Sequence, residues 1–295
     1  MFKEQTVSYT EHVVQRGPYH IYAREYPGEE PAIVLMHGFP DNLHLYDRLL
    51  PWLITPARRV VTFDFLGWGE SDKPAGYPYT AANQVGDLDA VIEQLHLQQV
   101  VLVAHDASGP PAIDWALAHA DRVAALVLLN TYYCMMPTLR PPEAILLNST
   151  PLVRNVARPV LKAFHNWLFR KMYWWQVGGF MRDAEVREEF LPVLYRQFTV
   201  TPSAQPAFFR LNEDLLFTVR DRTKRIPQMQ AFQRPVRIIF GAKDRYLNRG
   251  VARRFHELFP TSDLFLLPDA NHFVQIDEPE EVAHLLLSVS LADHA

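Results

Sequence analysis

The chain has 295 residues, of which 48% are hydrophobic, so it can bury the core of one large domain with an insertion. A formal net charge of −4 indicates neither a nucleic-acid partner nor binding to an anionic membrane. The single cysteine, Cys134, excludes an intrachain disulfide. Because there is also no secretory signal pattern and no long apolar run, we expect a cytoplasmic protein, monomeric or homodimeric.

The first part of the chain alternates strands with helices. A loosely alternating segment after Gly17 and Pro18 predicts an antiparallel hairpin at residues 19–26. Continuous apolar runs predict buried strands at 32–36 and 59–63, and leucines at helical spacing predict one helix over 45–53. Another amphipathic helix is expected over 85–95. Apolar strands separated by helices indicate a mostly parallel sheet covered on both faces.

The segment from Val100 to Gly109 carries the most informative residue of the chain. It reads as a buried strand that ends in small residues and leads into a helix starting near Pro111. A strand, a sharp turn and a helix are typical of the nucleophile elbow, in which a serine is expected. Here the central position is Asp106. A carboxylate can attack a saturated carbon and form an alkyl-enzyme ester, which favours opening of epoxides or displacement of halide over ester cleavage.

After the strand at 124–129 the alternation of strands and helices stops. From about residue 131 to residue 234 the sequence is rich in prolines and aromatic residues. We interpret this part as an inserted helical cap. The pattern resumes with predicted strands at 236–240 and 264–267 and helices at 251–258 and 279–290. The predicted organisation is therefore a first core segment at 1–133, a cap at 134–230 and a second core segment at 231–295.

Four motifs in this order carry a resemblance to a known family. They are His37-Gly38-Phe39-Pro40, the run from Asp64 to Ser71, His105-Asp106-Ala107-Ser108-Gly109, and Gly241-Ala242-Lys243-Asp244 with Asn271-His272-Phe273. With them the chain resembles the α/β-hydrolase superfamily, in the branch with an aspartate nucleophile that includes epoxide hydrolases and haloalkane dehalogenases. The resemblance implies an α/β fold with a mostly parallel eight-stranded sheet, helices on both faces and a helical cap.

The resemblance also implies roles for five residues. Asp106 would be the nucleophile, His272 the base that activates water, and Asp244 the acid that orients His272. The backbone N–H groups of Phe39 and Ala107 would form the oxyanion hole. We expect the neighbouring polar residues to be structural: His37 and His105 in the core, and Asp64 and Ser71 in a turn.

The cap should supply the group that binds the leaving atom. An epoxide oxygen needs hydroxyl donors, which epoxide hydrolases usually take from two cap tyrosines. The segment Phe208-Phe209-Arg210 resembles one that usually carries such a tyrosine, but lacks the hydroxyl here. The remaining hydroxyl candidates are Tyr132, Tyr133, Tyr173 and Tyr195.

A halide would need polarised N–H donors instead. Haloalkane dehalogenases usually have a tryptophan after the nucleophile and often an asparagine in the first loop, where this chain has Ala107 and Phe39. The indoles of Trp174 and Trp175 remain as candidates. These departures favour an epoxide hydrolase, with a haloalkane dehalogenase as the alternative.

Two further alternatives remain open: a non-catalytic small-molecule receptor, and a serine esterase that uses Ser108. The expected partners are a small, neutral, hydrophobic substrate and water. The sequence implies no cofactor, because it contains no paired cysteines, H-E-x-x-H motif or carboxylate cluster of the kind that binds a metal.

Overall fold

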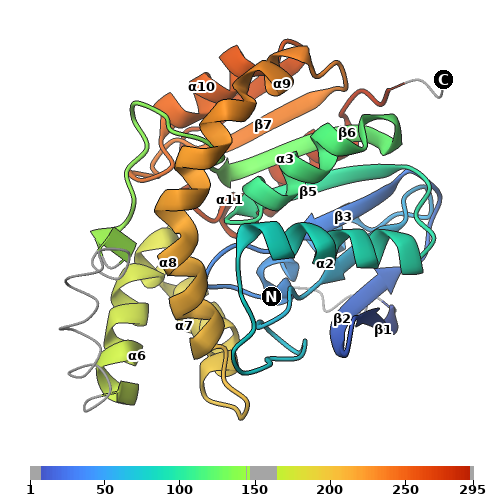
Figure 1. The fold of residues 1–295 in the computed structure, drawn as a ribbon. Helices are drawn as coiled ribbons and strands as arrows, with labels where there is room; N and C mark the ends of the chain where they lie inside the picture. The colour runs from blue at the N-terminus through green and yellow to red at the C-terminus, as the bar shows by residue number, and fades with distance from the viewer. Residues whose placement is uncertain (1–7, 144, 147–164, 293–295) are drawn as a thin grey trace.

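One eight-stranded sheet organises the chain (Figure 1). The computed structural model describes residues 8–143, 145–146 and 165–292. The strand order is β1-β2-β4-β3-β5-β6-β7-β8. The strands are β1 (Thr10–Arg16), β2 (Tyr19–Tyr26), β3 (Ala32–Met36), β4 (Val60–Phe63), β5 (Val100–Asp106), β6 (Val123–Thr131), β7 (Val236–Gly241) and β8 (Ser262–Leu267).

The sheet is mostly parallel, as predicted. β1 and β2 form the expected antiparallel hairpin, β2 pairs antiparallel with β4, and every other pair is parallel. All residues of β3, β4, β6 and β7 are buried. Continuous apolar runs form such strands because helices cover both faces of the sheet. The predicted fold class is therefore confirmed.

Helices cover the two faces. α2 and α3 lie in front of the sheet in Figure 1, whereas the red ribbon of the C-terminal segments is seen behind it. The helices of the core are α1 (Leu50–Leu53), α2 (Ala81–Gln94), α3 (Gly109–Ala118), α10 (Arg249–Leu258), α11 (Val274–Asp277) and α12 (Pro279–Leu287). The short 3-10 segments of the core are η1 (Leu43–Tyr46) and η2 (Ala120–Arg122).

The single helix predicted over 45–53 is wrong. The structure has two short pieces instead, η1 and α1. Asn42 caps η1 by accepting a hydrogen bond from the backbone N–H of His44. Pro51 lies in the first turn of α1, where its missing N–H leaves no helical hydrogen bond unmade, whereas in the middle of a longer helix it would remove one.

The predicted cap is helical where it is described. Between β6 and β7 lie α6 (His165–Gln176), α7 (Ala184–Tyr195), α8 (Gln205–Arg222) and α9 (Ile226–Ala231), with short 3-10 segments η3 (Gly178–Phe180), η4 (Arg196–Phe198) and η5 (Thr223–Arg225). α6, α7 and α8 form a group beside the sheet (Figure 1). Residues 144 and 147–164 of the predicted cap lie outside the described residues.

A buried ion pair joins the cap to the core. Arg222, at the end of α8, donates from Nε and Nη2 to one carboxylate oxygen of Asp114 on α3. Both side chains are 9% exposed, so the pair is largely removed from water. The hydroxyl of Tyr133 donates to the other oxygen of Asp114 at 2.7 Å. The end of α8 is therefore fixed to α3 through the Asp114 carboxylate, whose two oxygens both accept hydrogen bonds.

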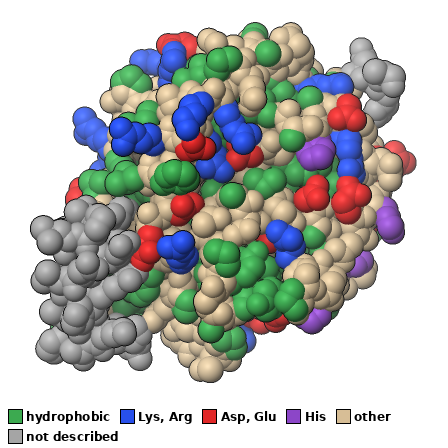
Figure 2. All heavy atoms as spheres, viewed as in Figure 1, with side chains coloured by type: hydrophobic (Ala, Val, Ile, Leu, Met, Phe, Trp, Pro, Cys, Tyr) green, Lys and Arg blue, Asp and Glu red, His purple; other side chains and the backbone are tan. Residues whose placement is uncertain are grey.

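The visible surface is mixed in charge. Acidic and basic side chains are interspersed on the face shown in Figure 2, without a broad area of one sign. Among the described helices, none combines the length and apolarity needed to cross a bilayer.

Candidate active site

Asp106 lies at the tip of β5 in a strained turn. Its φ is +47°, a conformation that few non-glycine residues adopt, although aspartate tolerates it better than most. The hydroxyl of Ser108 closes the turn by accepting from the backbone N–H of His105 and donating to the carbonyl of Met36. A Cβ on Gly38 would lie 2.7 Å from the Cβ of Asp106, so only glycine fits there. The turn therefore presents the Asp106 side chain to the cavity beyond the strand ends.

Two backbone N–H groups hold the Asp106 carboxylate. Phe39 donates to Oδ2 at 3.0 Å, and Ala107 also donates to this carboxylate. Burial raises the pKa of Asp106 above its ordinary value, while His272 and the two N–H groups oppose that rise. Phe39 and Ala107 are the pair that the sequence suggested for the oxyanion hole, and both of their N–H groups donate to this carboxylate.

His272 and Asp244 are brought together although they come from different loops. Nδ1 of His272 lies 2.8 Å from Oδ2 of Asp244, and both side chains are buried. Asp244 also accepts hydrogen bonds from the backbone N–H groups of Tyr246 and Leu247 and from Nδ2 of Asn130. Burial alone would raise the pKa of Asp244, but His272 and these donors outweigh it and lower the pKa below its ordinary value. Asp244 is thus held as a carboxylate.

The protonation of His272 depends on the carboxylates around it. Burial alone would lower its pKa, but Asp244, Asp106 and Asp41 outweigh that effect and raise it. With Nδ1 hydrogen-bonded to Asp244, Nε2 is the nitrogen that can exchange a proton with a ligand. His272 and Asp106 both line the cavity, so the arrangement places a carboxylate and an imidazole beside one space.

That space is a large, mainly apolar cavity between cap and core. It encloses about 1240 Å³, including the part open to solvent. Phe39 of the first loop stacks on Phe208 of α8, with ring centroids 4.9 Å apart. Other apolar lining residues include Met136, Phe169, Met172, Val177, Phe180 and Leu211. The hydroxyl-bearing side chains of Tyr132 and Tyr173 also line it.

The other predicted leaving-group donors lie outside the cavity lining. Tyr133 uses its hydroxyl on Asp114. Tyr195 packs edge-on against Tyr173, with ring centroids 5.1 Å apart. Trp174 packs on Tyr195 with its ring under the guanidinium of Arg170, and Trp175 is 61% exposed. Sequence periodicity could not separate these aromatic residues, because which of them faces the core depends on how α6 and α7 pack.

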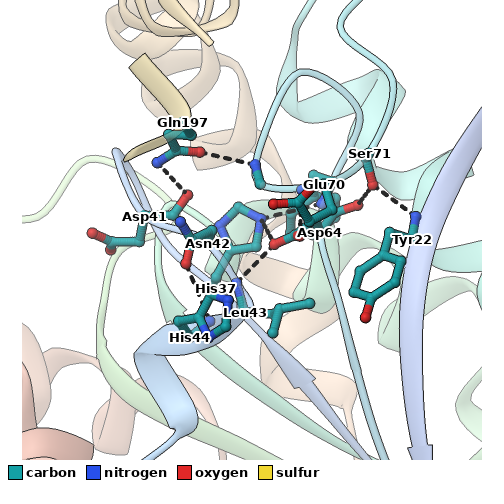
Figure 3. Close-up of polar contacts among 12 residues, drawn as sticks. Tyr22, His37, Asp41, Asn42, Leu43, His44, Asp64, Glu70, Ser71 and Gln197 are labelled. Carbon is teal, nitrogen blue, oxygen red and sulfur yellow. Dashed lines mark hydrogen bonds and ion pairs between the residues drawn. The ribbon is translucent and has the colours of Figure 1, made fainter. Parts of the chain in front are cut away.

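The residues expected to be structural form a hydrogen-bonded network under the first loop (Figure 3). The carboxylate of Asp64 accepts from the backbone N–H groups of Leu43 and Glu70, and Ser71 donates to the carbonyl of Asp64. His37 contacts the carbonyl of Gly38 with Nδ1 and accepts from the N–H of Phe65 at Nε2. Burial lowers the pKa of His37, so it stays neutral.

Sequence reasoning missed three residues of this region. Asn130 supports Asp244, and its position directly after the apolar strand β6 was a usable signal. Gln197 of the cap donates to the carbonyls of Pro40 and Asp41 and accepts from the N–H of Gly69, a long-range contact with no local signal (Figure 3). Asp41 is buried with no hydrogen bond to its carboxylate from any described residue.

The described residues contain no group of three or more His, Cys, Asp or Glu side chains arranged to hold a metal ion. Ser108, the alternative nucleophile, is 1% exposed and is absent from the cavity lining. Its hydroxyl accepts a hydrogen bond from the backbone N–H of His105 and donates one to the carbonyl of Met36.

Known proteins are similar to this chain over most of its length. It is 26% identical over 277 residues to a cis-3-alkyl-4-alkyloxetan-2-one decarboxylase of Xanthomonas campestris pv. campestris, covering 88% of each chain. It is 26% identical over 263 residues to haloalkane dehalogenase 2 of Mycobacterium tuberculosis, again covering 88% of each. It is 36% identical over 107 residues to epoxide hydrolase 2 of Siraitia grosvenorii, covering 36% of this chain and 34% of that one.

Residues 31–279 match the family described as the alpha/beta hydrolase fold. This match spans most of the chain and includes all the strands from β3 to β8 together with Asp106, Asp244 and His272. The chain is therefore a hydrolase of the α/β-hydrolase superfamily.

Proposed function

We propose that this enzyme opens a hydrophobic epoxide to a diol through a covalent ester on Asp106. The observation that carries the proposal is the Asp106 carboxylate itself. It is held by the N–H groups of Phe39 and Ala107 at the floor of an apolar cavity that His272 also lines. A carboxylate placed in this way can attack a saturated carbon, which a serine hydrolase does not do.

In the first step, one Asp106 oxygen attacks a ring carbon and the carbon–oxygen bond of the epoxide breaks. The attacking carboxylate must be ionised. The N–H groups and His272 favour the ionised form, although burial opposes it. The leaving oxygen becomes an alkoxide that needs a proton, and the hydroxyls of Tyr173 and Tyr132 are the donors available in the lining.

In the second step, His272 removes a proton from a water molecule that attacks the ester carbonyl. The oxyanion then forms on the carbonyl oxygen of the Asp106 ester, where the N–H groups of Phe39 and Ala107 stabilise it. Ester formation removes the negative charge of Asp106, which is one of the charges that raise the pKa of His272. Ester formation therefore lowers the pKa of His272 and favours the neutral imidazole, the form that acts as a base, at the stage when hydrolysis requires it.

The cavity lining favours oxygen over halide as the leaving atom. A halide site needs polarised N–H donors such as an indole, yet the described lining contains no tryptophan. It contains three tyrosines, Tyr132, Tyr173 and Tyr246, and the hydroxyl of Tyr246 donates to Glu143. Trp174 and Trp175, the indoles that could have served a halide, lie elsewhere in the cap. The apolar side chains around Tyr173 favour a neutral hydrophobic substrate.

The test uses His272→Gln, which should form the ester but fail to hydrolyse it. The variant is incubated with a medium-chain terminal epoxide or with the bromoalkane of the same chain length, and the intact protein is weighed. An epoxide adds its whole mass, whereas a bromoalkane adds its mass minus hydrogen bromide. We expect the epoxide adduct on the peptide that contains Asp106.

Two results would contradict the proposal. An adduct from the bromoalkane but not from any epoxide of a broad panel would indicate a dehalogenase. No adduct from either, with both compounds binding the protein, would favour a receptor. Asp106→Asn in the His272→Gln background is the matched control and should carry no adduct.

A further inference from the structure

Gln197 is a buried cap residue that the mechanism above does not use. It lies in η4, between α7 and α8, and is 3% exposed. Its Nε2 donates to the carbonyls of Pro40 and Asp41 at 3.1 Å and 3.2 Å, and to that of Leu194 at 3.1 Å. Its Oε1 accepts from the backbone N–H of Gly69 at 2.9 Å (Figure 3). One side chain of the cap therefore holds two loops of the core.

The first loop, which Gln197 holds, carries one donor of the oxyanion hole. The N–H of Phe39 donates to Oδ2 of Asp106 at 3.0 Å, and the two carbonyls bound by Gln197 belong to the next two residues. Before Phe39, Nδ1 of His37 lies 2.8 Å from the carbonyl of Gly38, which shares a peptide group with the Phe39 N–H. This donor is therefore held from the core on one side and from the cap on the other.

The side chain of Phe39 is also held from the cap. Its ring stacks on that of Phe208 in α8, with centroids 4.9 Å apart, and packs edge-on against Trp68 at 5.6 Å. Trp68 packs edge-on in turn against Phe198, the residue after Gln197, at 6.3 Å. Both the backbone and the ring of Phe39 thus depend on how the cap sits on the core.

The second donor of the hole is positioned within the core. The N–H of Ala107 belongs to the elbow, which the hydroxyl of Ser108 closes. That hydroxyl accepts from the N–H of His105 and donates to the carbonyl of Met36. A change at Gln197 should therefore act on the Phe39 donor and leave the Ala107 donor in place.

The Pro40 carbonyl also has a second donor, which the proposed reaction would withdraw. The hydroxyl of Tyr173 lies 3.4 Å from this carbonyl, but it must turn to the leaving oxygen to protonate it. A buried carbonyl left without a partner is costly. Because Gln197 bonds the same carbonyl at 3.1 Å, the loop keeps a hydrogen bond to the cap when Tyr173 turns away.

We propose that Gln197 is a positioning residue through which the cap sets the oxyanion hole for hydrolysis of the Asp106 ester. The inference rests on the function proposed above, and it places Gln197 in contact with the first loop and not with the substrate. The hole is therefore completed by the cap, and the core supplies only part of it.

The two chemical steps should respond differently to a displaced Phe39 donor. In alkylation the Asp106 carboxylate loses its negative charge, so a weaker N–H bond to it does not raise the barrier. In hydrolysis, water adds to the ester carbonyl, its proton goes to His272, and the electron pair of the carbonyl bond moves to the oxygen. The N–H bond then strengthens in the transition state, so its loss slows this step.

The experiment follows one turnover of a medium-chain terminal epoxide by rapid quench and intact mass. Gln197→Met removes the amide and keeps a side chain of similar length. Thr199→Val is the matched control, because Thr199 is exposed beside the same segment and its hydroxyl donates to the carbonyl of Arg196 within the cap. Each change is also made in the His272→Gln background, in which alkylation is measured alone.

Gln197→Met should slow hydrolysis of the ester roughly tenfold. This is less than the hundredfold or more that follows loss of a donor, because the Phe39 N–H is displaced and not removed. Alkylation should change by less than about threefold. The ester should therefore accumulate to a higher level in Gln197→Met than in the parent or in Thr199→Val.

Unfolding temperatures check that the variants are folded. If Gln197→Met does not fold, Gln197→Glu takes its place, since a carboxylate can still accept from the N–H of Gly69 but cannot donate to the two carbonyls. It should give the same pattern, with slower hydrolysis and nearly unchanged alkylation.

Three outcomes overturn the inference while the proposed function stands: hydrolysis at the parental rate in the folded variant, an equal loss in both steps, or an equal slowing in Thr199→Val. An ester from a bromoalkane alone would overturn the epoxide as substrate, and the hydrolysis of that ester would then decide the role of Gln197. If the parent protein forms no ester from either compound, both proposals fail.

Discussion

The floor and the roof of the cavity are built in different ways. On the floor, the loops that follow β3, β5, β7 and β8 hold polar side chains by dense hydrogen bonding, so that Asp106, Asp244 and His272 each have defined partners. The roof is made of aromatic packing. Phe198 of the cap packs edge-on against both Phe169 and Tyr173.

The difference indicates a division of labour. A hydrogen-bonded floor fixes the positions of reacting atoms, because each donor has one favoured geometry. An aromatic roof excludes water and accepts many shapes of hydrophobic substrate. We therefore expect substitutions on the floor to abolish the reaction and substitutions in the roof to alter its rate and selectivity. Substitutions at the joint, the buried Asp114–Arg222 pair between cap and core, should alter stability.

The largest effect is expected from the floor. Asp106→Asn should lower kcat for epoxide hydrolysis by at least about 10⁴-fold, because no ester can form. Asparagine also tolerates the φ of +47°, so the elbow should persist. Diol formation measures the rate, and the intact mass checks that the amide has not hydrolysed. Substantial turnover by a protein of unchanged amide mass would exclude Asp106 as the nucleophile.

A smaller effect is expected from the roof. Tyr173→Phe should lower the rate of epoxide alkylation by roughly a hundredfold, because it removes a proton donor from the lining. Tyr195→Phe is the matched control, since Tyr195 packs against Tyr173 outside the lining and should lose no more than a few fold. Equal losses in both variants would indicate that packing of the roof, and not the hydroxyl, limits the reaction.

At the joint the effect should be on stability. Arg222→Met removes the main partner of the buried Asp114, which keeps the Tyr133 hydroxyl and, at 3.4 Å, the guanidinium of Arg225. The change should cost about 3 kcal/mol, the lower end of the range for a broken buried pair. For a domain of this size that corresponds to a fall in Tm of roughly ten degrees. Lys224→Met breaks the exposed pair with Asp221 and should leave Tm unchanged within error. Similar small shifts in the two variants would show that the cap does not depend on the buried pair.

A second effect on stability concerns its pH dependence at Asp41. Its pKa is about 8 in the folded protein and about 3.9 in an unfolded chain, so between these values only the unfolded chain releases the proton. The wild type should therefore lose stability as the pH rises from about 4 to about 8, with no further loss above. Asp41→Asn lacks this loss. Its Tm advantage should grow across that window, and an advantage independent of pH would contradict the assignment.

Local pattern was sufficient for much of the fold and for the centre of the site. Apolar runs predicted β3, β4, β6 and β7, because strands buried on both faces need no polar positions. The elbow could be located because a strand, small residues and a helix follow each other within the segment from Val100 to Ala118. Asp244 and His272 were found through motifs that lie directly after strands.

Local pattern failed where the partner comes from far along the chain. The helix expected over 45–53 was a failure of another kind, because the leucine spacing concealed Pro51, a local signal that a helix begins there. Gln197 and Asp41 gave no sequence signal, since they acquire their surroundings only when the cap packs on the first loop.

The sequence by itself determined the strands of the sheet, the elbow and the residue at its tip, because each depends on residues adjacent in the chain. Only the tertiary structure decided which aromatic residues of the cap meet the cavity: Tyr173 and Tyr132 line it, while Tyr133, Trp174, Trp175 and Tyr195 do not. The physical reason is that a helix carrying aromatic side chains all round can bury any of its faces, and the packing of α6, α7 and α8 against the core selects one.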